Sequence, residues 1–193
     1  MAIKSYNPTT PSRRNMSVVD TADLSKVAPF KGLLKGKKSS GGRNNQGRIT
    51  TRFRGAGNKR SYRMVDFYRA KDGIVAKVAT IEYDPNRTAN IALIQYEDGE
   101  KAYIIAPVGL QAGDKVMNGP KAELKPGNSM KIKDIPVGVD ICCIELTPGR
   151  GAAIARSAGQ MAVLRGKEEE YAQIKLPSGE VRMIHVECRA MIG

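Results

Sequence analysis

The excess of positive over negative charge in this 193-residue chain lies entirely in its first third, and that division limits what the chain can fold into. Residues 1–63 contain 15 lysines and arginines and only two acids, Asp20 and Asp23, which gives a net charge of +13. Residues 64–193 contain 17 basic and 17 acidic residues, so the first third accounts for the net charge of the whole chain, also +13. An asymmetry of this kind indicates a basic segment that binds a polyanion.

The basic segment also lacks the apolar pattern of a folded domain. The stretch from Gly32 to Gly57 holds seven glycines, and such a segment cannot bury enough apolar surface to offset the conformational entropy that folding costs. We therefore expect an extension that is disordered alone and ordered by its partner. Basic segments that bind membranes usually form amphipathic helices, which the glycines oppose. Nucleic acid is thus the expected partner, no membrane is expected, and a tail that only aids solubility is the alternative.

From about Met64 onward, short apolar runs alternate with turns, a pattern typical of an all-β chain. The predicted strands are Ile74–Tyr83, Asn90–Tyr96, Lys101–Ala106, Met130–Ile135, Val139–Leu146, Gln160–Arg165, Tyr171–Leu176 and Glu180–Cys188. One short helical turn is expected over Ala152–Ala158, ended by Gly159. Strands of this length and spacing favour small barrels over a parallel sheet. We predict a mainly β fold, with a basic RNA-binding extension at residues 1–63 and two small barrels at 64–125 and 126–193.

The motifs of common enzymes are missing from the sequence. The stretch Gly32–Lys37 is similar to a phosphate-binding loop, but it has three residues between its glycines where the motif needs about four. The sequence has no Gly-x-Ser-x-Gly motif, and its one histidine, His185, leaves little scope for histidine-based catalysis. We therefore predict that the protein is not an enzyme and takes no cofactor and no small-molecule substrate.

The cysteines do not form a convincing metal site either. Cys142, Cys143, His185 and Cys188 are the residues that a zinc ion would require. If both segments are strands, adjacent cysteines point to opposite faces, and so do residues 185 and 188. We expect no bound metal, and we interpret the cysteines as small core thiols.

Composition also bears on where the protein works. Three cysteines without a framework spacing indicate a reducing compartment rather than a disulfide-stapled secreted domain. No run of apolar residues is long enough for a transmembrane helix. The first residues also lack the apolar core of a signal peptide.

The candidate RNA-binding residues are cations and two asparagines. Arginine binds phosphate through two parallel hydrogen bonds, and asparagine can reach base edges. Most candidates belong to the extension. The other five, which begin at Arg69, lie in predicted turns or at strand ends, from which side chains can reach a partner. The set is Lys37, Lys38, Arg43, Asn44, Asn45, Arg48, Arg52, Arg54, Lys59, Arg60, Arg63, Arg69, Lys71, Arg87, Arg150 and Arg156.

Several motifs, in order along the chain, resemble one known family. The run Ser40–Thr50, which reads Ser-Gly-Gly-Arg-Asn-Asn-Gln-Gly-Arg-Ile-Thr, resembles the N-terminal signature of large-subunit ribosomal protein two. Further matching blocks follow at Tyr83–Arg87, Ala89–Leu93, Tyr103–Pro107, Lys125–Asn128, Ile135–Gly138, Ala155–Gly159, Pro177–Glu180 and Cys188–Ala190. The chain is therefore identified as a member of this family, with a bacterial or mitochondrial character.

The resemblance implies a fold and a role. The fold would be an extended tail, an OB-like barrel and then an SH3-like barrel. The role would be that of a structural constituent of the large ribosomal subunit that binds ribosomal RNA and supports subunit association and the architecture of the peptidyl-transferase centre. The partners would be large-subunit ribosomal RNA and neighbouring ribosomal proteins. The location would be the ribosome, in a bacterial cytoplasm or in the mitochondrial matrix of an organelle that encodes the protein.

The sequence departs from the family in a few places. Family members usually continue with a further C-terminal extension rich in Gly, Arg and His, and this chain ends at Gly193. We therefore expect a truncated form, or a split protein with a separate polypeptide that carries the missing part. Cys142-Cys143 stands where the family usually has His-Asn, and Gly55–Lys59 departs from the usual Gly-Gly-Gly-His-Lys. A basic residue usual near Tyr68 is absent.

One alternative function is a free single-stranded RNA-binding protein that acts outside the ribosome. Such a protein would use the first barrel as a platform on which bases stack, and platforms of this kind need exposed aromatic side chains. Tyr83, Tyr96 and Tyr103 lie within apolar runs, so we expect them in the core rather than on such a platform.

Overall fold

The computed structural model describes residues 3–55 and 57–193. Met1, Ala2 and Ala56, which belong to the predicted extension, lie outside the described residues. The fold is mainly β, as predicted, and its strands pair antiparallel. Among the described residues, no helix is both long and apolar enough to cross a membrane.

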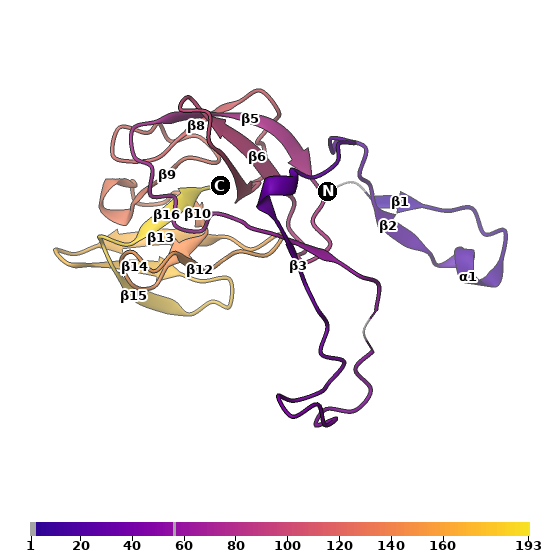
Figure 1. The fold of residues 1–193 in the computed structure, drawn as a ribbon. Helices are drawn as coiled ribbons and strands as arrows, with labels where there is room; N and C mark the ends of the chain where they lie inside the picture. Colours follow the sequence, from indigo (N-terminus) through magenta and orange to yellow (C-terminus); the bar gives the residue numbers. More distant parts are fainter. Residues whose placement is uncertain (1–2, 56) are drawn as a thin grey trace.

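The chain begins with a small hairpin that stands apart from the main body (Figure 1). Strands β1 (Ile3–Ser5) and β2 (Ser17–Val19) pair, and the one-turn helix α1 (Pro11–Arg14) lies between them. Thr10 begins this helix because its Oγ1 accepts a hydrogen bond from the Arg13 amide at 3.4 Å. Apolar side chains of this hairpin are exposed, so it is held by its own hydrogen bonds rather than by a core.

The first large sheet has four strands in the order β7-β6-β5-β8. Its strands are β5 (Val75–Glu82), β6 (Ile91–Tyr96), β7 (Lys101–Ile105) and β8 (Lys115–Met117). Strand β6 is buried on both faces: Ala92 and Ile94 point into the core of this sheet, and Ile91 and Leu93 pack on the other side. The pattern explains why β6 reads as a continuous apolar run rather than as an alternating one.

The second large sheet has six strands in the order β15-β14-β13-β10-β16-β9. The strands of this half are β9 (Ser129–Lys131), β10 (Asp140–Cys142), β11 (Ile144–Glu145), β12 (Ala152–Ile154), β13 (Ala162–Lys167), β14 (Tyr171–Lys175), β15 (Val181–His185) and β16 (Arg189–Ile192), with the 3-10 helix η2 at Ile132–Asp134. Its core is built from isoleucine, leucine and alanine side chains that point inward from these strands.

Three predictions about this half are wrong. The predicted strand Met130–Ile135 is a strand only as far as Lys131, and the 3-10 helix η2 follows it. The predicted strand Val139–Leu146 divides into β10 and β11, because Cys143 has a left-handed φ of 49° and its amide donates to the Ala155 carbonyl at 3.0 Å. The helical turn predicted over Ala152–Ala158 is instead the strand β12, which pairs with β11. Tertiary pairing therefore overrides the local helix propensity of the alanines.

A third apolar cluster joins the two sheets. It contains Ile91, Tyr103 and Ile105 from the first sheet and Cys142 and Met191 from the second. Because the same buried side chains serve both sheets, the two halves meet through an apolar core as well as through surface contacts.

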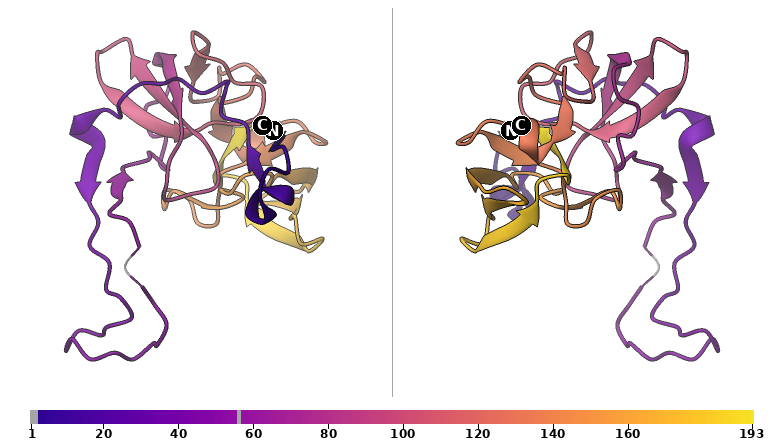
Figure 2. Two further views of the ribbon diagram at one scale, coloured as in Figure 1. Left: turned by 90° about the vertical axis from the view of Figure 1, so that its right-hand side faces the viewer. Right: turned by 90° about the vertical axis from the view of Figure 1, so that its left-hand side faces the viewer.

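Residues 31–63 of the extension form a long arm that projects from this body (Figure 2). It starts at the 3-10 helix η1 (Lys31–Leu33) and strand β3 (Leu34–Gly36), and it returns at strand β4 (Ser61–Arg63), which pairs with β3. Residues 37–60 connect the two strands, and we call them the basic loop.

Candidate nucleic-acid interface

The basic loop carries eight lysines and arginines and no acid. Each of these cations is exposed, and in the part of the chain that the structure describes none of them forms an ion pair. They are Lys37, Lys38, Arg43, Arg48, Arg52, Arg54, Lys59 and Arg60. A cluster of unpaired cations on an arm that projects from the body creates a strong positive potential without an internal counterion.

The tip of the basic loop has a defined turn, although we expected it to be disordered alone. Asn44 Oδ1 accepts hydrogen bonds at 3.0 Å from the backbone amides of Gln46 and Arg48. The Thr50 and Thr51 amides donate to the Gly42 carbonyl at 3.0 and 3.2 Å. Asn44 thus shapes the loop with its oxygen, while the exposed side chain of Asn45 makes no hydrogen bond to the described residues.

Gly42 leaves no room for a side chain. Its φ is +77°, and a Cβ placed there would lie 2.1 Å from the Thr51 carbonyl oxygen. Any side chain would therefore push apart the two chain segments that face each other at the tip. The sequence pair Gly41-Gly42 gives this turn its shape.

The start of the arm is fixed to the first sheet by a chain of hydrogen bonds. The Phe30 amide donates to the Tyr103 hydroxyl at 2.9 Å, and that hydroxyl donates to Glu82 Oε2 at 2.9 Å. Tyr103 is fully buried, and burial, with the acceptor Glu82 beside it, raises the pKa of Tyr103 to about 12. The neutral phenol therefore serves as a fixed link between the sheet and the arm.

The end of the arm is fixed to the turn after β5. Arg60 Nη1 donates to the Pro85 carbonyl at 2.8 Å, and Asn86 Nδ2 donates to the Ser61 carbonyl at 2.8 Å. The Asp84-Pro85-Asn86-Arg87 turn, which directly follows the predicted strand Ile74–Tyr83, thus also holds the base of the basic loop.

A buried carboxylate organises the cations at this base. Asp84 is fully buried and accepts hydrogen bonds from the amide and side chain of Asn86, both at 2.9 Å, and from Arg87 Nε at 2.6 Å. Burial alone would raise the pKa of Asp84, but the hydrogen bonds from Asn86 and Arg87 outweigh it and hold that pKa below its usual value. Arg63 Nη1 lies 3.8 Å from the same carboxylate.

Arg87 and Arg156 lie over the ring of Phe67. Their guanidinium carbons are 5.8 and 4.9 Å from the ring centroid, distances at which a cation is attracted to the ring face. Arg156 is exposed, whereas the side chain of Arg87 is only 15% exposed. We call Arg60, Arg63, Arg87 and Arg156 the base cluster; of these, Arg60 and Arg156 are the members that solvent reaches freely.

Lys71 and Arg150 occupy different surroundings. Lys71 forms ion pairs with Asp98 and Glu100, and the hydrogen bonds that its ammonium donates to these carboxylates raise the pKa of Lys71 above its usual value. Arg150 is exposed in the Thr147–Gly151 turn and forms no ion pair among the described residues. Arg150 is therefore free to bind a partner, while Lys71 would first have to leave its carboxylates.

Arg69 lies in the interior, which differs from the expectation of a turn side chain that reaches the RNA. It is 6% exposed, and its guanidinium donates to Asn118 Oδ1 at 2.9 Å and to the Gly127 carbonyl at 3.0 Å. Its own amide donates to Asp66 Oδ1 at 3.0 Å, and burial lowers the pKa of its guanidinium. The hydrogen bonds of Arg69 therefore connect the first sheet to the segment that enters the second.

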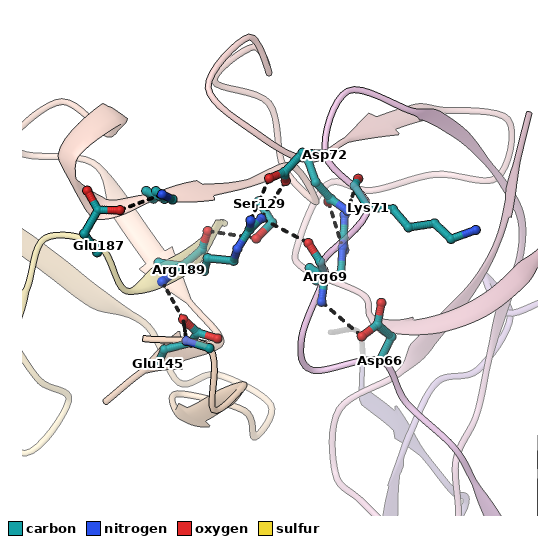
Figure 3. Close-up of polar contacts among 12 residues, drawn as sticks. Asp66, Arg69, Lys71, Asp72, Ser129, Glu145, Glu187 and Arg189 are labelled. Atoms are coloured by element: carbon teal, nitrogen blue, oxygen red, sulfur yellow. Dashed lines mark hydrogen bonds and ion pairs between the residues drawn. The ribbon is translucent and has the colours of Figure 1, made fainter. Parts of the chain in front are cut away.

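Arg189 was not among the predicted site residues, yet its hydrogen bonds also connect the two halves of the chain. We call the contacts of Arg69 and Arg189 between the halves the junction. Its guanidinium donates to both carboxylate oxygens of Asp72 at 2.6 and 2.7 Å and to the Arg69 carbonyl at 3.1 Å (Figure 3). Its hydrogen bonds hold the pKa of Asp72 below the usual value. The Arg189 amide donates to the buried Glu145 at 2.9 Å. No local pattern marks these residues, because they are far apart in the sequence.

The three tyrosines considered for a stacking platform are in two different environments. Tyr103 and Tyr96 are buried, as expected, at 0% and 4% exposure. Tyr83 is 60% exposed, so the prediction that it belongs to the core is wrong. It stands one residue beyond β5, where the strand has ended and the chain turns.

Two family models match the sequence, and together they cover most of it. The model described as Ribosomal Proteins L2, RNA binding N-terminal domain, matches residues 30–118. The model described as Ribosomal Proteins L2, C-terminal domain, matches residues 125–193. The first match contains the basic loop and the four-stranded sheet, and the second contains the six-stranded sheet. The chain therefore belongs to the ribosomal protein L2 family, whose members are structural, RNA-binding constituents of the large ribosomal subunit.

Proposed function

We propose that the basic loop enters the folded ribosomal RNA and neutralises phosphates that would otherwise repel one another. The single observation that carries this proposal is the set of eight exposed cations without an ion-pair partner among the described residues. The electrostatic gain comes from the release of counterions from the RNA when these cations approach its phosphates. The body of the protein sets the direction of the arm through the contacts of Phe30 and Asn86.

We propose that the chain works as three parts, at residues 1–63, 64–125 and 126–193. The first part, with the basic loop, supplies most of the phosphate contacts. The two β parts present the exposed Arg150 and Arg156 to fixed RNA surfaces. The junction through Arg69 and Arg189 would hold these surfaces in one arrangement.

The proposed RNA-binding set follows from the exposure of each cation. It comprises the eight cations of the basic loop, with Asn45 at its tip, and the exposed Arg150 and Arg156. Arg63, Arg87 and Asn44 would act largely by positioning their neighbours, because the side chain of each already forms a hydrogen bond to a protein group. Lys71 would bind RNA only in exchange for its ion pairs, and Arg69 would act through the junction.

The finer roles are proposed from the family. They are support of subunit association and of the peptidyl-transferase architecture, contact with neighbouring ribosomal proteins, and no chemical step of the chain's own. We propose that the ribosome concerned is that of a bacterial cytoplasm or of a mitochondrial matrix. A separate polypeptide that continues the C-terminal part would appear as a peptide that comigrates with this chain.

The first test is the salt dependence of RNA binding. Neutralisation of about eight phosphates predicts a slope of about −6 to −7 in a plot of log affinity against log salt. The full chain would be titrated with large-subunit ribosomal RNA over a range of salt concentrations. A slope of about −2 or shallower would contradict the proposed mechanism.

Matched triple variants separate the basic loop from general charge. The loop variant carries Lys38→Gln, Arg48→Gln and Arg54→Gln, and the control carries Lys121→Gln, Arg165→Gln and Arg182→Gln, six exposed residues without ion pairs among the described residues. The loop variant should have a slope shallower by about 2 to 3, and the control should keep a slope close to that of the original chain. Equal changes in both variants would show that only the net charge matters.

A sucrose gradient of native lysate then tests assembly. After a wash at about 0.5 M salt, which strips loosely held cations, the chain should sediment with the large subunit. The same fractions, analysed by mass spectrometry, would show any comigrating polypeptide. Release to the top of the gradient would contradict a built-in ribosomal role.

Of the three tyrosines considered for a stacking platform, Tyr83 alone is exposed and could support the free single-stranded RNA-binding alternative. If Tyr83 were part of a stacking platform, Tyr83→Leu should cost about 1–3 kcal/mol of RNA affinity. Under the proposed mechanism the same change leaves affinity almost unaltered. Tyr96 and Tyr103 are buried and cannot stack on bases while the fold is intact.

A further inference from the structure

Phe53 is an aromatic side chain of the basic loop that the protein leaves uncovered. It is 93% exposed, the largest exposed fraction among the large hydrophobic side chains of the described residues. The other two phenylalanines have contacts in the body: Phe67 packs against the apolar cluster that joins the two sheets, and Lys101 Nζ lies 5.0 Å from the ring centroid of Phe30. Single exposed apolar side chains are common, so the backbone and the neighbours of Phe53 decide what its ring can do.

The backbone of Phe53 is in the left-handed region, with a φ of 62°. This conformation is unfavourable for a residue with a Cβ and is rare for a bulky one. The residues on both sides of Phe53 lie against Gly42. The Thr51 amide donates to the Gly42 carbonyl at 3.2 Å, and a Cβ added to Gly42 would lie 3.2 Å from the Cβ of Arg54. Strain of this kind is concentrated at functional sites, and here it accompanies a ring that is held in solvent.

Cations surround this ring. Arg52 and Arg54 flank Phe53 in the sequence, and the guanidinium carbon of Arg52 lies 5.2 Å from the ring centroid, a distance at which a cation is attracted to the ring face. The basic loop contains no acid. A partner that fits this position therefore combines negative charge for the arginines with a flat surface for the ring. A nucleotide with an unpaired base has both, since its phosphate is an anion and its base presents a π-face.

We propose that Phe53 stacks on an unpaired base of the ribosomal RNA, while Arg52 and Arg54 bind the phosphates beside that base. This inference rests on the proposed entry of the basic loop into the RNA, and it adds a contact that is not electrostatic. Unstacked bases are found in loops, in bulges and at helix ends, so the ring directs the loop to such places. Stacking is tolerant of sequence, so Phe53 distinguishes an unpaired base from a continuous helix without reading which base it is.

The first test compares Phe53→Leu with the original chain in titrations with large-subunit ribosomal RNA. Leucine keeps an apolar side chain but offers no ring, so the affinity should fall about tenfold. The slope of log affinity against log salt should stay the same, because no cation is lost. Phe53→Tyr keeps a ring and should bind within about twofold of the original chain. Equal affinities of Phe53→Leu and the original chain would overturn the proposal.

Two further variants separate the ring from other effects. Ile49→Ala is the matched control, because Ile49 is apolar, 60% exposed and in the same loop, and it should change the affinity by less than about twofold. Phe53→Gly keeps the turn, since glycine adopts a positive φ readily, and it should lose as much affinity as Phe53→Leu. A loss in Ile49→Ala equal to that in Phe53→Leu, or full affinity in Phe53→Gly, would overturn the stacking role.

Fluorescence gives a direct measure of the contact. The chain contains no tryptophan, so Phe53→Trp introduces a single indole at this position. A stacked base should quench the indole emission when ribosomal RNA is added, and a fully paired RNA duplex should quench it much less. Val108→Trp, at a residue of the body that is 91% exposed, is the control and should keep its emission with either RNA. Equal quenching by both RNAs, or at both positions, would overturn the proposal.

The salt slope separates the stacked base from the electrostatic role on which it rests. A slope of about −6 to −7 in both the original chain and Phe53→Leu, with equal affinities, would remove the stacked base and keep the electrostatic role of the loop. A slope of about −2 or shallower in the original chain would contradict the electrostatic role. The quenching of Phe53→Trp does not depend on the slope, so it decides for or against stacking in either case.

Discussion

Arg156 is, with Arg60, one of the two exposed residues of the base cluster, and its role can be tested alone. Its guanidinium lies over Phe67 and donates to the Ala152 carbonyl at 3.2 Å, so its removal leaves no buried charge behind. Arg156→Ala should weaken RNA binding and make the salt slope shallower by about 1. The thermal unfolding of the variant should match that of the original chain.

The control for this change is Arg182→Ala, another exposed arginine, which lies on the edge strand β15. Arg182→Ala should leave RNA affinity unchanged. A large fall in melting temperature for Arg156→Ala would show that Arg156 is structural instead.

Asp84 links the fold of the base cluster to pH. Its pKa in the folded chain lies below the ordinary value of 3.8. The ionised carboxylate therefore stabilises the fold above that pH, and the stabilisation is lost as pH falls through the lower, folded-state pKa. Asp84→Asn should lower the melting temperature at about pH 7 and reduce the further fall between about pH 5 and pH 3.

Melting curves of both proteins across this pH range provide the check. Parallel losses of stability below about pH 5 would mean that other carboxylates dominate acid unfolding. Asp72 is one such group, since Arg189 lowers its pKa, so Asp72→Asn provides a useful comparison.

At the residue scale, sequence patterns predicted exposed cations well and buried ones poorly. The cations of the basic loop lie in a segment without acids, and they are exposed as such a composition predicts. Arg69 also lies near a turn, but its guanidinium reaches the Gly127 carbonyl, 58 residues away in the sequence. Long-range hydrogen bonds of this kind leave no local pattern, so an interior arginine cannot be distinguished from a surface one.

At the scale of elements, the basic loop can be deleted without the loss of any core residue. Gly36 and Ser61 are paired at the ends of β3 and β4, so residues 37–60 can be replaced by Asn-Gly, a sequence that favours a two-residue hairpin turn. The shortened chain should keep its melting temperature, because the loop contributes no buried side chain among its described residues.

The same deletion should remove most of the salt dependence of RNA binding. The eight lost cations correspond to a change of about 6 to 7 in the slope. Titration of the deleted and full chains with the same RNA measures the difference. An unchanged slope would place the phosphate contacts on the two β parts instead.

Strands were easier to predict than their breaks. The strands β5, β6, β7 and β14 were predicted with nearly their observed ends, because each is an apolar run with a turn signal on either side. β12 and β16 were missed, because each is short and takes its strand form from its partners, β11 for the first and β10 and β9 for the second. The same applies to β3 and β4, which are strands only because they meet each other at the base of the loop.

At the scale of the whole molecule, the junction predicts that the two halves unfold together. Arg69, Arg189 and the shared apolar cluster all cross from the first sheet to the second. Calorimetry of the original chain should therefore give one transition. Arg69→Met keeps much of the side-chain volume but leaves the Gly127 carbonyl without its donor, so the free energy of unfolding should fall by about 2–4 kcal/mol.

The Arg69→Met transition should also broaden or split, because the coupling between the halves is weaker. Arg165→Met, at an exposed position on β13, is the matched control and should leave the curve unchanged. A sharp single transition at the original temperature in Arg69→Met would show that the apolar cluster alone couples the halves.

The hydroxyl of Tyr103 has a consequence for the order of events in ribosome assembly. It accepts from the amide of Phe30, the residue before the arm, and donates to the carboxylate of Glu82 in β5. The Tyr103 ring is buried, so this link forms only when the first sheet has folded. Folding of the sheet therefore aims the arm before any RNA is met. An arm that already points in one direction searches fewer orientations during an encounter. The rate at which the protein binds the nascent subunit is then set by diffusion to the RNA rather than by reorientation of the arm.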